Sequence, residues 1–153
     1  MLARSFTGKR ARKLFAVRRL QDLWTMVFGD EPPLIPEGML ALKLERRAEQ
    51  RMVDDLRDLL SNYDSPDPVM PLMLSSFDVG NLKAAASALA MGRKETPFFV
   101  DMGTQSLVDT SAWPDIAKMT GDGPFSWYNQ VPTVTDLPAN EIRLDKQYYR
   151  LVW

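Results

Sequence analysis

Apolar side chains recur every three or four residues along much of this chain, the spacing of one face of an α-helix. The clearest case begins at Pro36, which suits a first helical position, and runs for about seven turns. Its apolar face is Leu40, Leu44, Ala48, Met52, Leu56, Leu59 and Tyr63. Its other face carries Glu45, Arg46, Arg47, Glu49, Arg51, Asp54, Asp55 and Asp58. The pattern predicts a long amphipathic helix with a solvated side, ended by Asn62, Ser65 and Pro66.

The segment before it also has helical spacing and is strongly basic. One apolar face is predicted from Leu14, Val17, Leu20, Trp24 and Val27, with the helix ending at Gly29. Phe6, Phe15 and Trp24 are expected to be core positions. The cations that precede the first acid, Asp22, are Arg4, Lys9, Arg10, Arg12, Lys13, Arg18 and Arg19.

Two helical segments are predicted after the long helix. Asp67 is the expected N-cap of a short segment that ends near Phe77, and Asp78 is the expected cap of a separate alanine-rich helix. The apolar stripe of this second helix is Val79, Leu82, Ala86 and Leu89, and its stop is Gly92 followed by Arg93 and Lys94. Its many alanines predict a close helix–helix contact.

The pattern is weaker from Glu95 to about residue 135. Residues 98–100 fit a strand or an extended loop, 106–108 and 112–119 fit short helices, and 121–124 fit a turn. Helical spacing returns at Ala139, with Leu144, Tyr148 and Leu151 on one side. The chain is therefore predicted to be all-α, a single helical domain over 1–153 with an irregular stretch around 95–135.

Composition removes several kinds of chemistry. The chain has no cysteine and no histidine, so disulfides, thiolate metal sites and the commonest general base are excluded. Gly121-Asp122-Gly123 lacks the spacing and the lysine of a phosphate-binding loop. Turn and cap roles are the expected explanation of Asp101, Asp109 and Asp115. We therefore expect no catalytic residue, no metal and no cofactor.

The basic N-terminal segment is the strongest local electrostatic feature, because the whole chain has a net charge of −1. It fits either a solvated helix face balanced by the acids of the long helix or an arm that contacts phosphates or an acidic partner. Association with a membrane surface is a less favoured alternative, because the apolar stripe is more useful inside a helical bundle. A small helical nucleic-acid-binding or regulatory module is thus an alternative function. Apolar stretches are interrupted by charge well short of ~20 residues, so no membrane insertion is expected.

One stretch, FDVGNLKAAASALAMGRK, has a distinctive order of residues. It resembles the C (or d) subunit family of V/A-type rotary ATPases in an aromatic–acid–x-x-Asn-Leu-Lys motif. The matching residues are Phe77, Asp78, Asn81, Leu82 and Lys83. The closing EIRLDKQYYRLVW is similar to a second family segment through Leu144, Asp145, Tyr148 and Tyr149.

The resemblance runs from about residue 5 to the end and implies a helical-bundle unit that matches the N-terminal portion of a longer protein. Residues 135–153 would then begin a following helical unit. The implied function is a non-catalytic adaptor of an ion-translocating ATPase, peripheral on the cytoplasmic face of the membrane. Its implied partners are the other proteins of the central stalk and the membrane rotor ring, with no nucleic acid.

Candidate partner contacts are the cations of the basic segment and those around the alanine-rich helix. These are Arg10, Arg12, Arg18, Arg19, Lys83, Arg93 and Lys94. A partial funnel is also expected to expose apolar surface near Tyr148, Tyr149 and Trp153, which predicts some self-association.

Overall fold

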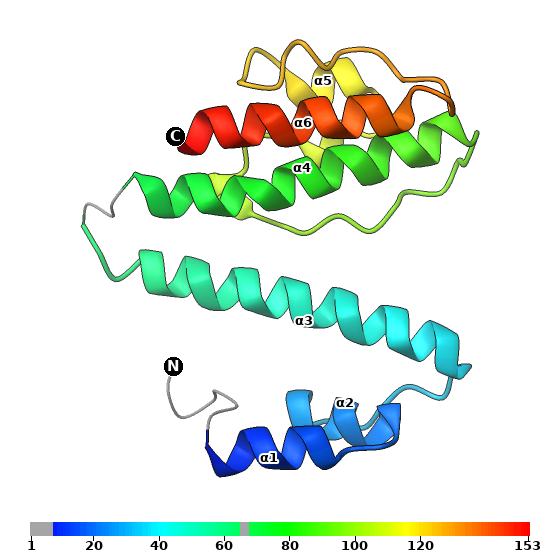
Figure 1. Ribbon diagram of the computed structural model, residues 1–153, viewed down its shortest axis with the longest axis vertical. Coiled ribbons are helices and arrows are strands. Elements are labelled where there is room, and N and C mark those ends of the chain that lie inside the picture. The colour runs from blue at the N-terminus through cyan, green and yellow to red at the C-terminus, as the bar shows by residue number, and fades with distance from the viewer. Residues whose placement is uncertain (1–7, 65–67) are drawn as a thin grey trace. The chain divides into compact units, whose positions relative to one another are not determined.

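The computed structural model describes residues 8–64 and 68–153, and every regular element in them is a helix (Figure 1). The elements are α1 (Lys9–Ala16), α2 (Leu20–Phe28), α3 (Glu37–Leu60), α4 (Val69–Ala90), the 3₁₀ turns η2 (Gly103–Gln105) and η3 (Thr110–Ala112), α5 (Ile116–Thr120) and α6 (Leu137–Val152). The predicted all-α fold is confirmed. The predictions for Phe6, Ser65, Pro66 and Asp67 lie outside the described residues.

The chain divides into two compact units within α3. Unit 1 is Met1–Asp55 and unit 2 is Leu56–Trp153. The single-domain organisation over 1–153 stays a prediction.

Unit 1 corrects the prediction of one continuous basic helix. The chain is helical in α1 and α2 but extended between them, with ψ angles of 134° at Val17 and 137° at Arg19. Val17 is β-branched and therefore a weaker helix residue than its neighbours. The predicted stop at Gly29 is confirmed, since Gly29 has a φ of 80° and ends α2 in the left-handed conformation.

The long helix α3 is present with nearly the predicted bounds, but its predicted apolar face is partly wrong. Leu40 is buried, whereas Met52 is 49% exposed and Val53 is buried in its place. Steps of four residues turn about 40° beyond a full helical turn, so a run spaced by four drifts around the helix. By Met52 the predicted apolar positions therefore no longer lie on the buried side of α3.

The two predicted helices after α3 are one helix, α4, and Asp78 lies inside it rather than at its start. Asp78 is fully buried and accepts hydrogen bonds from a distant segment, so its side chain is used in tertiary structure instead of capping. The predicted C-terminal stop is confirmed. The N–H of Gly92 donates to the carbonyl of Leu89 and the N–H of Arg93 to that of Ala88, a Schellman pattern.

Unit 2 is built around α4, and α6 runs alongside it (Figure 1). Their shared core is Val79, Leu82, Ala85, Ala86, Val108, Ile116, Met119, Phe125, Tyr128, Leu137 and Leu144. Ala85 and Ala86 are almost completely buried in this core, in agreement with the close packing predicted from the alanines. α6 therefore completes the core of unit 2.

The stretch from 95 to 135 is irregular, as predicted, but its short helices differ from those expected. The predicted short helix at 112–119 is present in part as α5, whereas 106–108 is not helical and the other helical turns are η2 and η3. Residues 98–100 are an extended segment without strand pairing. These short pieces have too few residues for a periodic signal. The side chains of Asp109 and Asp115 cap η3 and α5 by accepting from the backbone N–H groups of Ser111 and Lys118.

Candidate interaction surfaces and the residues that support them

Asn81 fixes the extended segment that follows α4. Its Nδ2 donates to the carbonyl of Val100 at 2.9 Å, and its Oδ1 accepts from the Val100 N–H at 2.8 Å. Both residues are buried, so water does not replace these bonds. An asparagine side chain offers one donor group and one acceptor, which matches both backbone groups of Val100.

Asp78, one turn earlier in α4, holds the next part of the same segment. Its Oδ2 accepts from the Leu107 N–H at 2.9 Å, and its Oδ1 lies 2.6 Å from the Ser106 hydroxyl. The same hydroxyl lies 2.6 Å from the carbonyl oxygen of Val108. A serine has a single hydroxyl proton and cannot donate it to both oxygens.

A neutral Asp78 resolves this conflict. If Asp78 carries a proton on Oδ1, it donates to Ser106, and Ser106 in turn donates to the Val108 carbonyl. Burial raises the pKa of Asp78, and the hydrogen bonds from Leu107 and Ser106 offset only part of that rise. Burial therefore shifts Asp78 toward its protonated form relative to an exposed aspartate.

Lys83 and Asp145 connect α4 to α6. The ammonium Nζ lies 2.7 Å from Oδ1 of the carboxylate, and the two side chains are partly exposed. Leu82 and Leu144, the residues just before them in sequence, are both fully buried in the same core. The two stretches that carry the family resemblance therefore contact one another.

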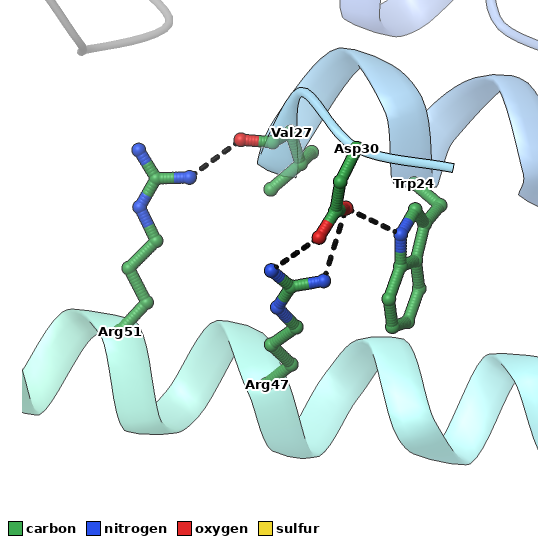
Figure 2. Close-up of polar contacts among 5 residues, drawn as sticks. All are labelled: Trp24, Val27, Asp30, Arg47 and Arg51. Atoms are coloured by element: carbon green, nitrogen blue, oxygen red, sulfur yellow. Dashed lines mark hydrogen bonds and ion pairs between the residues drawn. The ribbon is translucent and has the colours of Figure 1, made fainter. Parts of the chain in front are cut away.

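In unit 1, Arg47 joins α3 to the end of α2 (Figure 2). Its guanidinium forms two hydrogen bonds with Asp30, at 3.0 and 2.7 Å, and lies 4.9 Å from the ring centroid of Trp24 and 4.3 Å from that of Phe28. The indole N–H of Trp24 also donates to Asp30 at 2.8 Å. Hydrogen bonding to Arg47 is the main reason that the pKa of Asp30 is lowered.

Arg51 makes a second contact of this kind, donating to the carbonyl of Val27 near the C-terminus of α2 (Figure 2). A cation suits this position because the last carbonyls of a helix have no intrahelical partner. Sequence reasoning placed Arg47 and Arg51 on a solvated face and missed both contacts. Because Arg47 and Asp30 are 17 residues apart, no local pattern marks the pair.

The acidic residues of the irregular stretch have the predicted turn and cap roles. Asp101 accepts from the Gly103 N–H, Asp109 from Ser111, and Asp115 from the Lys118 N–H. The hydrogen bonds from Ser111 lower the pKa of Asp109, and those from Lys118 lower the pKa of Asp115.

Asp101, Asp109 and Lys118 also line an open hollow of about 450 Å³. In the part of the chain that the structure describes, carboxylates do not gather in a group that could hold a metal ion.

The cations predicted to contact partners fall into three groups. Arg12, Arg18 and Arg19 are exposed in unit 1, where Arg10 belongs to α1. Arg93 and Lys94 are exposed just after α4. Lys83 differs from the rest because its ammonium group is bound to Asp145 within the fold.

The predicted apolar surface at the end of α6 is exposed in part. Tyr149 is 60% exposed and Trp153 is 98% exposed, whereas Tyr148 is half-buried and packs against the core of unit 2. Across residues 8–64 and 68–153, none of the helices combines the length and the hydrophobicity that crossing a membrane requires.

Comparison with known proteins identifies a bacterial relative. An uncharacterized protein of Treponema pallidum (strain Nichols) is 30% identical over 153 residues, which is 100% of this chain. The chain spans 45% of the length of that protein. No family model matches the chain, and no solved structure matches it.

Proposed function

We propose that this chain forms part of a non-catalytic adaptor subunit of a V/A-type rotary ATPase. In this role it links the central stalk to the membrane rotor ring on the cytoplasmic face of the membrane. The observation that carries the proposal is the Lys83–Asp145 ion pair, since it joins the two stretches that resemble this rotary-ATPase family. A resemblance made of two separate stretches gains weight when both belong to one packed structure.

The contacts around α4 suit an element that transmits force. Asn81 and Asp78 hold the segment from Val100 to Leu107, and Lys83 holds α6. The alanines allow close packing in the core of unit 2. Torque transmission requires a stiff body rather than a reactive group, and each of these contacts removes a freedom of movement.

The length of the Treponema relative also supports the proposal. That protein is more than twice as long as this chain, which covers 45% of it. The resemblance likewise relates the chain to the N-terminal portion of a longer protein.

The test is affinity purification of the tagged chain from its native cells, followed by identification of the proteins recovered. We expect proteins of the central stalk and the rotor ring to co-purify and to diminish when Arg93 and Lys94 are changed to Gln. The matched control is Lys43→Gln with Lys146→Gln, which removes the same charge from other exposed positions. Recovery of nucleic acid released steeply by salt, without ATPase proteins, would support the alternative module instead.

A further inference from the structure

The segment from Lys9 to Arg19 presents a basic surface with one exposed aromatic side chain. Its exposed cations are Lys9, Arg12, Lys13, Arg18 and Arg19. The sequence contains no acid before Asp22, so no acid within the segment itself balances this charge. Such a surface attracts polyanions.

Phe15 adds a feature that sequence reasoning missed, because it was expected in the core. It is 87% exposed, while Leu14 and Val17 of the same segment are partly buried. Arg12 and Phe15 are three residues apart in α1 and therefore neighbours on its surface. The exposed side of α1 thus combines cations with a large apolar side chain.

We propose that residues 9–19 bind an anionic lipid surface, with the cations on the phosphate and carboxylate headgroups and Phe15 in the headgroup–acyl boundary. A basic helix with an exposed aromatic residue is a recognised arrangement for peripheral attachment to a bilayer. Each Lys or Arg close to an anionic leaflet adds about 1 kcal/mol to the binding free energy, which is about fivefold in affinity. The charge and exposure of residues 9–19 support this membrane contact independently of the adaptor role.

Nucleic acid is the competing polyanion, and two observations favour lipid. Proteins that bind single strands stack successive bases on several aromatic side chains. Trp24, the next aromatic residue along the chain, is only 3% exposed. Within residues 8–28, Phe15 is therefore the exposed aromatic ring near the cations. Nucleic-acid-binding domains are also usually strongly basic overall, whereas this chain has a net charge of −1.

The experiment is co-sedimentation of the purified full chain with two kinds of vesicle, pure phosphatidylcholine and equal parts phosphatidylcholine and phosphatidylserine. We expect binding to the anionic vesicles that weakens as salt rises. The triple variant Arg12→Gln/Arg18→Gln/Arg19→Gln should bind roughly 100-fold more weakly, at about fivefold for each cation. Phe15→Ala should weaken binding by roughly tenfold.

The control variant is Lys43→Gln/Lys146→Gln/Arg150→Gln, which removes the same charge from exposed positions outside the segment. Equal binding to both vesicles, or equal weakening by the control, would overturn the inference. So would tighter binding of a DNA duplex than of anionic vesicles at the same salt, with loss in the same triple variant. Vesicle binding requires no other protein. A chain that fails to bind vesicles can therefore still co-purify with stalk proteins, and a chain that fails to co-purify can still bind vesicles.

Discussion

The ammonium group of Lys83 lies 2.7 Å from a carboxylate oxygen of Asp145, although the two residues are 62 positions apart in the chain. One is in the middle of α4 and the other in α6. Lys83 and Asp145 are partly exposed, whereas Leu82 and Leu144, which immediately precede them in the sequence, are fully buried. The ion pair thus lies at the edge of the apolar core, and the association of the two helices comes mainly from that core.

A double-mutant cycle should detect this pair as a modest stabilising interaction. With Lys83→Met and Asp145→Asn, we expect a coupling of about 0.5 kcal/mol in the free energy of unfolding, measured by urea denaturation. The value is small because water screens both side chains, which are 28% and 47% exposed. The Lys118–Asp115 pair has a lysine that is 76% exposed and should give a smaller coupling. Equal coupling in the two pairs would contradict this assignment.

Replacing Asn81 should be among the most damaging changes in unit 2. Asn81→Ala leaves the buried N–H and carbonyl of Val100 without partners and should lower the free energy of unfolding by about 2–4 kcal/mol. Asn81→Asp should not restore stability, since it keeps an acceptor but loses the donor to the carbonyl. Amide hydrogen exchange at Val100 should accelerate in both variants. Ser76→Ala, an exposed position of the same helix, should change stability by less than about 0.5 kcal/mol.

Asp78 should behave as a neutral group at acidic pH. Asp78→Asn reproduces the protonated form, with an N–H donor for Ser106 and an oxygen for Leu107, so it should be tolerated. Asp78→Ala provides neither group and should cost about 1–3 kcal/mol in the free energy of unfolding. If Asp78→Asn is stable and Asp78→Ala is not, the hydrogen bonds of this side chain, rather than its carboxyl group, stabilise unit 2.

The pH dependence of Asp78 follows from its raised pKa. A carboxyl group whose folded-state pKa is above its unfolded value of 3.8 contributes stability below that value and loses it as pH rises through the folded pKa. Wild type should therefore become less stable relative to Asp78→Asn as pH rises from acid toward neutral. Denaturation of both proteins across this range measures the difference, and an opposite slope would show that Asp78 is ionised in the folded protein.

Asp30 should show the opposite pH dependence, because its pKa is lowered, chiefly by Arg47. Its contribution to stability is present above the unfolded value of 3.8 and is lost as pH falls through the lower folded pKa. An NMR titration of the Asp30 carboxyl group should give a pKa below that value. Arg47→Gln should move it upward, and no movement would show that Arg47 is not the cause.

The sequence alone determined the helical character of this chain and the sites where several helices end. The long run from Pro36, the stop at Gly29 and the Schellman end at Gly92 depend on spacing and on residues close in sequence. Local rules are reliable there because every partner lies within about one helical turn. The turn roles of Asp101, Asp109 and Asp115 are local in the same way.

Only the tertiary structure decided what the long-range polar residues do. Asp78 has the sequence context of a cap, yet its partners Ser106 and Leu107 are 28 and 29 residues away. Arg47 belongs to a face that the sequence predicts to be solvated, and its contacts with Asp30 and the rings of α2 depend on how two helices meet. Phe15, expected in the core, is 87% exposed near the end of α1, where the chain leaves the helical conformation at Val17. Periodicity identifies which side of a helix is apolar, but packing between elements decides which side is covered and which charges find partners.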